Sequence, residues 1–417
     1  MTIATEAALP LVPSEEERQI REAVRGICDG FPEDYARQKY AADEPPTELW
    51  DALAEKGYLG VNLPEEWGGG GLGMGGLAAV GEEIAAAGKS LLLIVVSPAI
   101  VGNIIARHGT EAQKERWLRG IAAGTTKIAF AITEPDAGTN SHNLATSVER
   151  RGDTLVLRGQ KTYISGVEHA DAVLVVARSR LPDGSLGLPS LAIVDVDTPG
   201  FTRDQIPMPY LGPDKQWTLF FDDVELEDER LIGGEGGGLG PVFDGLNPER
   251  IMGAAIACGA GRRALAKAAA YANERVVWGA PIGTHQGIAH PLAEAKIELE
   301  LARLMMQKAC ALYDAGVRGA GEASNMAKYA AAEAAIKCVD RAIQAHGGNG
   351  FALEYGLSDM WWGVRLTRTA PVSREMILNY VAEHSLGLLR IPGASSGRYA
   401  QGTCSSEAGS PRDISIL

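Results

Sequence analysis

The chain has 417 residues, enough for about three domains, and its 46% hydrophobic and 22% charged residues are typical of a soluble globular protein. A formal net charge of -14 argues against nonspecific binding of nucleic acid, and the sequence contains no polybasic membrane patch. Five cysteines without a CxxC pair indicate reduced thiols and a cytoplasmic setting. The apolar run that begins at Leu91 is too short to span a membrane, and the N-terminus lacks a signal-peptide core.

Helical spacing dominates residues 1–124. Ser14 followed three residues later by Glu17 is the pattern of a helix start, and apolar residues recur at helical spacing from there to about Cys28. The glycine-rich residues 67–83 are interpreted as a loop that leads into a second helix. We therefore predict an N-terminal α-helical domain.

The residue pattern changes at about Thr125. Short β-branched and apolar runs, separated by Gly, Asp and Pro, follow to about Leu231 and predict mostly antiparallel strands. The RGD sequence at Arg151 lies between two such runs and is interpreted as a hairpin turn without a function of its own. Residues 125–240 are therefore expected to form a middle β-barrel or β-sandwich domain.

Helical spacing returns after the glycines that follow this region. Five side chains fall on one face of the first long helix of the C-terminal half, as expected for a helix that packs in a bundle: Leu301, Leu304, Met305, Lys308 through its stem, and Leu312. A second long helix should end at Gly347. Long Ala-rich helices predict a four-helix bundle over residues 241–390, and the Gly-, Ser- and Pro-rich tail 391–417 is predicted to be disordered. The expected fold class is thus α+β.

Two local patterns are interpreted as structural. Overlapping GxGxxG matches begin at Gly68 and Gly71, but no good strand precedes them and no βαβ unit follows, so a turn is favoured over a dinucleotide-binding loop. The seven histidines are scattered, and no acidic or thiol residue completes a metal set near His285 and His290. We predict no metal site.

Four segments in a fixed order carry the most specific signal: AFAITEPDAGTNS (129–141), GQKTYISG (159–166), NERVVWGAPIGTHQ (273–286) and QAHGGNGF (344–351). Together with the α, β, α arrangement they resemble the FAD-dependent acyl-CoA dehydrogenases. The resemblance extends from about Ser14 to Arg390. It implies an enzyme that binds FAD and an acyl-CoA.

The resemblance places the first two segments beside the flavin. It implies isoalloxazine contacts from Phe130, Ile132 and Thr133, whose donors would stabilise the N1 to O2 edge on reduction. In the second segment the implied flavin contacts are Tyr163 over the ring face, Ile164, and Ser165 on the N5 edge. The resemblance also implies that Thr139 contacts the cofactor and hydrogen-bonds the pantetheine or phosphate arm of the acyl-CoA. Many relatives have Trp in place of Tyr163.

The other two segments are implied to reach the FAD of a neighbouring subunit in a homotetramer built as a dimer of dimers. Arg275 would pair with the FAD pyrophosphate, a task suited to a guanidinium fork. The remaining residues of this set would shape the adenosine and phosphate cleft: Trp278, Gln286, Gln344, Gly347 and Gly348. A simpler interpretation makes Arg275 a cation that closes an Ala-rich helix.

Family chemistry needs a carboxylate base that removes the α proton of the thioester, in a dry pocket that raises its pKa. Most relatives carry this Glu in a loop of the last helical region, where Ala370 occupies the matching position in this chain. A minority branch, which includes isovaleryl-CoA and long-chain acyl-CoA dehydrogenases, places the base directly before a family-wide Arg. Glu249 followed by Arg250 matches that branch, so we predict Glu249 as the base.

Local sequence offers a physical setting for this residue. Asn247 is a reasonable helix N-cap and Pro248 fits the first helical position, which would put Glu249 in the first turn. There the helix dipole opposes the rise in pKa that burial causes, and the sequence does not decide which prevails. The alternative is that Glu249 is only a favourable acid at a helix start.

Residues around the vacated loop position also follow from the resemblance. The backbone N–H of Ala370, with the flavin ribityl hydroxyl, is expected to polarise the thioester carbonyl. Asn247 and Arg250 are expected to contact the substrate, although relatives usually have Asp where this chain has Asn247. Val372 and Arg374 replace the Thr and the Gln or Glu that contact FAD in relatives, and Arg374 is expected to answer phosphate charge.

The function predicted from the sequence is α,β-dehydrogenation of an acyl-CoA thioester to a trans-2-enoyl-CoA, with flavin N5 accepting the β hydride. An electron-transferring flavoprotein would take the electrons. The same fold would also suit carrier-protein-bound acyl groups, or an oxidase or flavin monooxygenase. A catalytically silent subunit that binds flavin or a partner protein is a further alternative.

Overall fold

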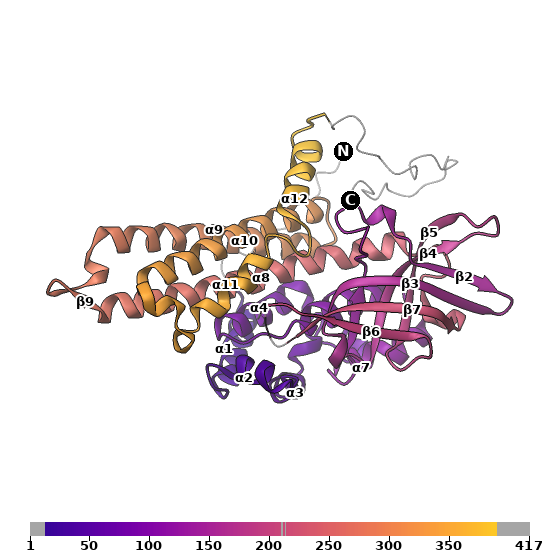
Figure 1. The fold of residues 1–417 in the computed structure, drawn as a ribbon, viewed down its shortest axis with the longest axis horizontal. Helices are drawn as coiled ribbons and strands as arrows, with labels where there is room; N and C mark the ends of the chain where they lie inside the picture. The colour runs from indigo at the N-terminus through magenta and orange to yellow at the C-terminus, as the bar shows by residue number, and fades with distance from the viewer. Residues whose placement is uncertain (1–12, 210–211, 213, 390–417) are drawn as a thin grey trace.

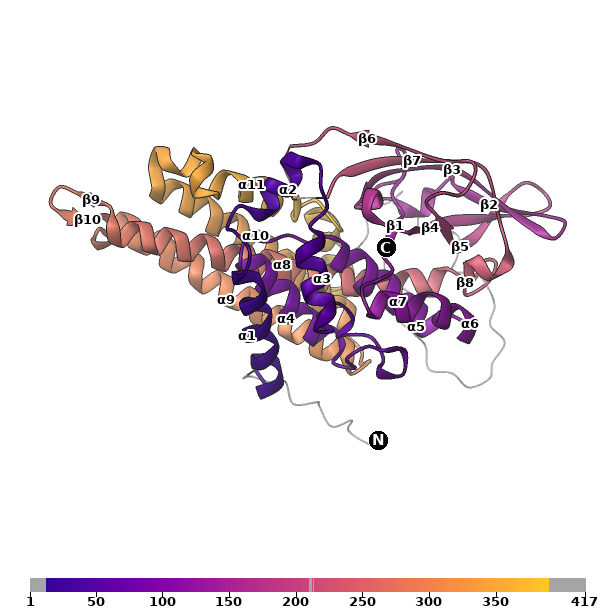
Figure 2. The same ribbon diagram turned by 90° about the horizontal axis from the view of Figure 1, so that it is seen from below.

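The computed structural model describes residues 13–209, 212 and 214–389, so the predicted disordered tail 391–417 lies outside the described residues. A sheet domain occupies one end of the molecule, and long helices extend from it to the opposite end, where strands β9 (Val276–Val277) and β10 (Ala280–Pro281) form a small hairpin (Figure 1). The N-terminal helices pack against the middle of the long helices (Figure 2). The predicted α+β class and the helix, sheet, helix order are confirmed.

The N-terminal part is helical, as predicted. Its helices are α1 (Glu15–Asp29), α2 (Tyr35–Ala42), α3 (Thr47–Glu55), α4 (Gly73–Ala86), α5 (Asn103–His108), α6 (Glu111–Gln113) and α7 (Arg119–Ala122), with a π-helical segment η3 (Val95–Gly102) before α5. The Oγ atom of Ser14 accepts a hydrogen bond from the N–H of Glu17 at 3.1 Å, which confirms the predicted start of α1. The glycine-rich segment leads into α4 without a preceding strand, so the turn interpretation is also confirmed.

The middle part is a single eight-stranded sheet with the order β6-β7-β3-β2-β4-β5-β8, in which β1 pairs with β4. The strands are β1 (Ile128–Ala131), β2 (Ser147–Arg151), β3 (Thr154–Ser165), β4 (Ala172–Arg180), β5 (Leu186–Asp195), β6 (Phe201–Ile206), β7 (Gln216–Leu226) and β8 (Leu231–Ile232). Only the β1–β4 and β2–β4 pairs among these are parallel. Arg151 pairs with Thr154 across the RGD turn, so the predicted hairpin is confirmed.

The C-terminal part is built on three long helices, α8 (Leu239–Glu274), α9 (Gln286–Asp314) and α10 (Ala320–His346), followed by the shorter α11 (Leu357–Leu366) and α12 (Arg374–Tyr380). The helix α10 packs against α8, α9 and α11. As predicted, α10 ends before Gly347, which adopts a positive φ of 58° that favours glycine.

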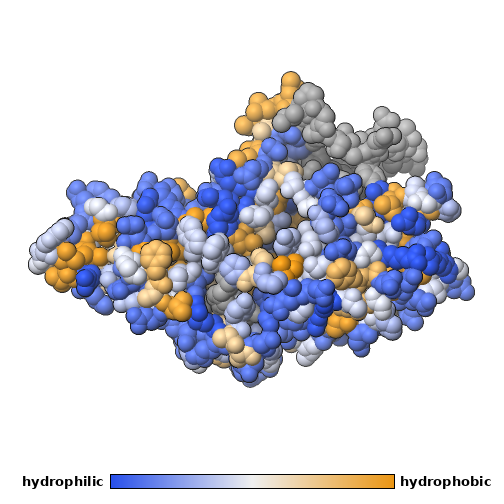
Figure 3. Space-filling model, viewed as in Figure 1, coloured by the Kyte–Doolittle hydropathy of each residue, from blue (hydrophilic) through white to orange (hydrophobic). Residues whose placement is uncertain are grey.

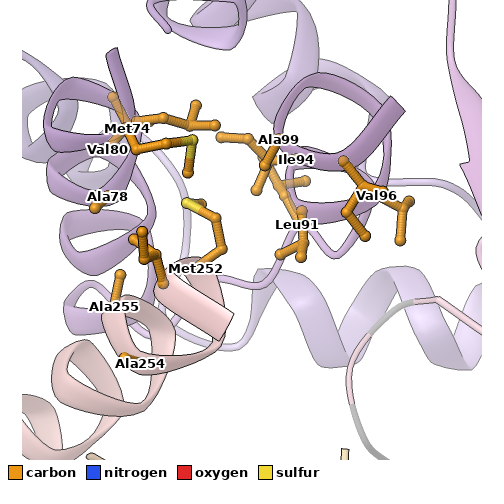
Figure 4. Packing of buried hydrophobic residues seen from close by; sticks show 14 of the residues in the cluster. Met74, Ala78, Val80, Leu91, Ile94, Val96, Ala99, Met252, Ala254 and Ala255 are labelled. Atoms are coloured by element: carbon orange, nitrogen blue, oxygen red, sulfur yellow. The ribbon is translucent and has the colours of Figure 1, made fainter. Parts of the chain in front are cut away.

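The helices α4 and α8 cross at very short range because glycines stand at the crossing. A Cβ atom added to Gly81 would lie 2.7 Å from Cε of Met252, and one added to Gly259 would lie 2.2 Å from the carbonyl oxygen of Glu82. Met252 consequently enters a buried apolar cluster between α4, η3 and α8 (Figure 4). This cluster belongs to the main core, which also covers one face of the sheet, while a second core covers the sheet's other face.

The helix face chosen from the sequence of α9 is wrong in part. Leu301 and Leu304 are 62% and 50% exposed, whereas Met305 and Leu312 are partly buried against the core. The buried face instead carries mainly small residues: Ala295, Leu299, Ala302, Met306, Ala309, Cys310 and Tyr313. Both faces satisfy the helical period. The face with small side chains is the buried one because it lets α9 approach α8 and α10 closely.

The predicted start of α8 is also wrong. The helix begins at Leu239, with Gly238 as its N-cap, and Pro248 lies inside it, so Asn247 is not a cap. Proline has no N–H to donate to the carbonyl of Asp244 four residues earlier. The hydroxyl of Tyr313 on α9 donates to that carbonyl at 3.1 Å, which replaces the missing helical hydrogen bond.

A buried cluster of charges joins four helices. The carboxylate of Glu82 on α4, with its side chain fully buried, accepts hydrogen bonds from Arg21 at 2.8 Å, Arg262 at 3.0 Å and Arg303 at 2.6 Å, which lie on α1, α8 and α9. The neighbouring Glu83 also pairs with Arg21 and Arg262. The N-terminal helices are thereby tied to the bundle by ion pairs shielded from solvent.

Four cysteines, Cys28, Cys258, Cys310 and Cys338, are buried free thiols, and Cys404 lies outside the described residues. None of the helices in the described ranges is both long enough and apolar enough to cross a membrane.

Replacing Glu82 by Gln should lower the free energy of unfolding by about 3 kcal/mol, because three guanidinium groups would lose their shared buried countercharge. Thermal and urea unfolding of the two proteins measure the difference. The matched control is Lys56→Ala, which removes an exposed ion pair with Glu55 and should cost less than about 1 kcal/mol. Equal stability of Glu82→Gln and wild type would show that this cluster does not hold the helices together.

Candidate active site

Glu249 lies about three turns into α8 and is partly buried. The helix dipole acts mainly within the first turn, so its opposition to a raised pKa is weak here. Burial raises the pKa of Glu249 to about 7, although the charges of Arg250 and Lys328 act in the lowering direction. Burial therefore prevails over the helix dipole, and the carboxyl group can exchange a proton near neutral pH.

Arg250 is only 5% exposed, and its Nη1 atom donates to Oδ1 of Asn247 at 2.9 Å. Burial lowers the pKa of this guanidinium, while the charge of Glu249 acts to raise it. Asn247 thus orients Arg250 from the preceding turn of the same helix. The two residues predicted to contact substrate lie beside the predicted base.

The loop after α11 lies against α8 close to Glu249. A Cβ atom added to Gly253 would lie 3.6 Å from Cδ of Pro371, and Gly253 shares a helix face with Glu249 one turn earlier. Ala370 precedes Pro371 directly. The vacated base position and the predicted base are therefore neighbours on the same side of α8.

The predicted role of the Ala370 N–H does not agree with the structure. This N–H donates to the carbonyl oxygen of Leu366 at 2.9 Å, in the turn that follows α11. A donor engaged in this way is not directed at a substrate carbonyl. The last turn of the helix takes the N–H because a helix end leaves its carbonyl groups in need of donors.

Arg374 at the start of α12 is held by acidic neighbours of the same chain. Its guanidinium lies 3.3 Å from Glu333 and 3.6 Å from Glu375, and it stacks over the ring of Tyr329 at 5.6 Å. Glu333 also binds Arg368 through both carboxylate oxygens, at 2.8 and 2.6 Å. The carboxylates of Glu333 and Glu375 therefore offset the positive charge of Arg374, which was expected to bind phosphate.

On the sheet side, a buried lysine orients the segment after β1. The side chain of Lys161 is fully buried, and its Nζ atom donates to the carbonyl of Ile132 at 2.9 Å and to Glu134 at 2.7 Å. The N–H of Thr162 binds the carbonyl of Thr133 at 2.9 Å. Because the C=O and N–H of one peptide unit point in opposite directions, the N–H of Thr133 is directed away from Lys161.

The charges of this buried pair favour each other. Burial lowers the pKa of Lys161 to about 8, against the opposing charge of Glu134. Burial would raise the pKa of Glu134, but Lys161 and the N–H groups of Ala145 and Thr146 lower it overall. The pair is thus ionised at neutral pH and holds residues 132–134 in one conformation.

The remaining predicted flavin contacts differ in exposure. The ring of Tyr163 is 60% exposed, with a positive φ of 57°, and Ser165 donates from Oγ to Gln216 at 3.0 Å. Phe130 and Ile164 are buried in the two cores, so only their backbone can face a ligand. Thr139 is exposed in the loop between β1 and β2.

The second set of predicted cofactor residues lies at the opposite end of the bundle. Arg275 follows α8, and Trp278 is 92% exposed at the tip of the β9–β10 hairpin (Figure 1). The end of α10 lies beside them, since His346 stacks on Tyr271 at 4.1 Å. The other members of this set are also exposed: Arg275, Gln286, Gln344, Gly347 and Gly348.

The two sets are too far apart to share one ligand within this chain. From Glu249 to Arg275 the helix advances about 39 Å at roughly 1.5 Å per residue. The sheet-domain set lies toward the other end of α8 (Figure 1). No group of three or more His, Cys, Asp or Glu that could hold a metal occurs in the described ranges.

The chain thus combines helical, sheet and helical parts in this order with an oriented backbone segment after β1 and a carboxyl group on α8 whose pKa is raised to about 7. Comparison with known families gives matches to the acyl-CoA dehydrogenase N-terminal domain over residues 14–125, the middle domain over 129–224 and the C-terminal domain over 236–386. The chain belongs to the acyl-CoA dehydrogenase family, and it is an FAD-dependent oxidoreductase that acts on CH–CH groups.

Individual relatives support this assignment. The chain is 53% identical over 380 residues to acyl-CoA dehydrogenase FadE12 of Mycobacterium tuberculosis, which covers 91% of this chain and 98% of the relative. It is 34% identical over 331 residues to glutaryl-CoA dehydrogenase of Desulfococcus multivorans, covering 78% and 83%. A glutaryl-CoA dehydrogenase from Mycobacterium smegmatis, solved in complex with FADH2, superposes with a TM-score of 0.83 at 26% identity, covering 90% and 96%.

Lys161 and Lys328 are buried cations near the predicted site residues that the sequence analysis missed. Lys161 stands in a strand where its position is buried, and Lys328 stands among Ala and Met residues of α10. A lysine at a position whose neighbours predict burial is the signal that would have found both, because such residues are rarely buried without a partner.

Replacing Lys161 by Met should weaken FAD binding about tenfold or more, because the carbonyl of Ile132 would lose its charged donor and the Thr133 peptide its orientation. Equilibrium dialysis and the visible spectrum of the reconstituted protein measure this. The control Arg158→Met removes an exposed cation from the same strand and should leave FAD affinity unchanged. The double variant Lys161→Met/Glu134→Gln avoids a lone buried carboxylate. Wild-type affinity in that variant would contradict the role of Lys161.

Proposed function

We propose that the protein oxidises an acyl-CoA thioester to a trans-2-enoyl-CoA, with Glu249 as the base that removes the α proton. The observation that carries this proposal is the close approach of Pro371 to α8, since a Cβ atom added to Gly253 would lie 3.6 Å from Cδ of Pro371. Glu249 lies on the same face of α8, one turn before Gly253, and Ala370 directly precedes Pro371. A carboxylate from α8 can thus serve the place where most relatives have their loop glutamate. The vacancy at Ala370 removes a competing base.

The electrostatics support a proton-transfer role. A general base works best when its pKa lies near the working pH, and the pKa of Glu249 is about 7. Arg250 adjoins the carboxylate and favours its ionised form. Arg250 and Asn247 would also meet the substrate at this point. Polarisation of the thioester carbonyl by the Ala370 N–H is not part of the proposal.

The surroundings of Glu249 suit an acyl chain. Met252, less than one turn further along α8, begins the buried apolar cluster that also contains Leu91, Ile94 and Val96 (Figure 4). Apolar walls next to the base exclude water and keep its pKa raised. The acyl tail would lie against this cluster, and the thioester would lie between Glu249 and the sheet domain.

The residues at the edge of the sheet domain fit a flavin. The directed N–H of Thr133 offers a donor for a ring edge, and the exposed Tyr163 offers an aromatic face. When bound, FAD would accept the β hydride at N5. Ile132, Thr133, Tyr163 and Ser165 would orient the ring. Because the chain belongs to this family, an electron-transferring flavoprotein is the proposed electron acceptor.

A second copy of the chain would complete each FAD site. Arg275 and the glycine segment after α10 are about 39 Å along α8 from Glu249, so they would bind the phosphates and adenosine of the FAD held by a neighbour. Exposed apolar residues support assembly. Ile297, Leu301 and Leu304 are exposed along α9, and Figure 3 shows further apolar side chains on and after α12. A homotetramer built as a dimer of dimers is the proposed state.

Replacing Glu249 by Gln should slow anaerobic reduction of the flavin by an acyl-CoA roughly 10²–10⁴-fold, because the amide cannot accept the α proton. In the wild type the same rate should rise with pH up to about 7 and then level, because the base acts when ionised. Stopped-flow spectroscopy with short, branched and long acyl-CoAs measures both effects. Unchanged FAD content in the variant is the control. If Glu249→Gln still reduced its flavin at the wild-type rate, Glu249 would not be the base.

Mixed oligomers test whether FAD sites are shared between chains. Chains carrying Glu249→Gln and chains carrying Arg275→Ala should each be nearly inactive alone. Co-purified through two different tags, a mixed pair has one site with both defects and one site with none, so about half of the activity should return. No recovery in the mixed oligomer would mean that Arg275 serves the site of its own chain, or no site.

A further inference from the structure

Lys328 on α10 carries a buried ammonium group. The residue is 2% exposed, and its Nζ atom donates to the carbonyl of Val372. Among the described residues, no carboxylate lies within salt-bridge distance of this nitrogen. Burial of a charge without a paired countercharge is costly, and a backbone carbonyl offsets only part of that cost.

The hydrogen bond of Lys328 connects three elements around the proposed base. Val372 lies in the same loop as Ala370 and Pro371, and Pro371 lies close to α8, where a Cβ atom added to Gly253 would be 3.6 Å from its Cδ. The loop is therefore clamped between α8 and α10, with Lys328 as the donor that holds its carbonyl. A change at this donor would alter the loop at the position next to Glu249.

The charges around Lys328 and Glu249 come from three helices. Lys328 is affected by Glu249 and Arg250 on α8, Glu333 on α10 and Glu375 on α12. Glu249 is affected by Arg250 and Lys328, and Arg250 is affected by Glu249 and Tyr380 on α12. Burial and the charge of Arg250 lower the pKa of Lys328 to about 8, while the carboxylates act to raise it. The ammonium is thus still charged at pH 7, where the carboxyl group of Glu249 titrates.

We propose that Lys328 is a positioning residue for the proposed base, because its buried ammonium both clamps the 370–372 loop onto α8 and supplies a positive charge that favours ionised Glu249. This inference rests on the proposed role of Glu249. It assigns Lys328 no contact with the substrate. As a consequence, Glu249 is ionised at a lower pH than it would be if Arg250 were the only nearby cation.

The test is the pH dependence of anaerobic flavin reduction in the FAD-loaded enzyme. Lys328→Met should move the pH midpoint of the rate upward by about one unit, which means roughly a tenfold loss below pH 7 and convergence with wild type at high pH. Lys328→Arg keeps the charge and should keep the midpoint. Lys337→Met, which removes an exposed cation of α10 paired with Glu298, is the matched control and should change nothing.

Lys328→Gln separates the two parts of the role. Its amide can still donate to Val372, but it carries no charge, so the midpoint should move as in Lys328→Met while the loop stays in place. This variant also serves if Lys328→Met fails to fold. An equal fall in rate at every pH, or an unmoved midpoint in both neutral variants, would overturn the proposal.

The base and its positioning residue fail in different ways. If Glu249→Gln retains the wild-type rate and midpoint, the proposed function fails and Lys328 has no base to act on. If Glu249→Gln abolishes the midpoint near 7 but the neutral Lys328 variants leave it in place, only the role of Lys328 fails. The thermal unfolding midpoint and FAD content of each variant identify a loss that is merely structural.

Discussion

The unbroken course of α8 through Pro248 is the constraint on which the rest of the structure depends. An interior proline removes a helical hydrogen bond and costs about 3 kcal/mol, and the hydroxyl of Tyr313 supplies a replacement donor to Asp244. The helix can therefore begin at Leu239 beside the sheet domain and end at Glu274 at the far end of the bundle. Glu249 consequently lies in the middle of the molecule, where burial controls its pKa.

Two buried lysines each bind a backbone carbonyl group in a segment that is proposed to form the site. Lys161 binds the carbonyl of Ile132, and Lys328 binds the carbonyl of Val372. Each draws one backbone oxygen inward and so determines which way the neighbouring peptide groups point. Burial lowers the pKa of both ammonium groups to about 8, which is the electrostatic cost of this arrangement. Both hydrogen bonds hold segments that are proposed to form the site.

Close packing by small residues decides which surfaces remain outside. Gly81 and Gly259 let α4 and α8 cross at short range, and α9 turns its alanines toward α8 and α10. Leu301 and Leu304 of α9 are then left at the surface, although they have the size and polarity of core residues. These exposed apolar residues agree with the proposed assembly of several copies, and so does the distance between the two sets of residues proposed to bind FAD.

Local patterns in the sequence determined the helix, sheet, helix order, the start of α1 at Ser14, the RGD hairpin and the end of α10, because short-range sterics and hydrogen bonds decide them. Motifs alone also selected Glu249, Arg250 and the segments proposed to lie beside the flavin. The tertiary structure alone decided where α8 begins, which face of α9 is buried, and that the N–H of Ala370 is engaged by Leu366. It alone brought Lys161 and Lys328 to the site, because burial and long-range hydrogen bonds depend on residues far apart in the chain.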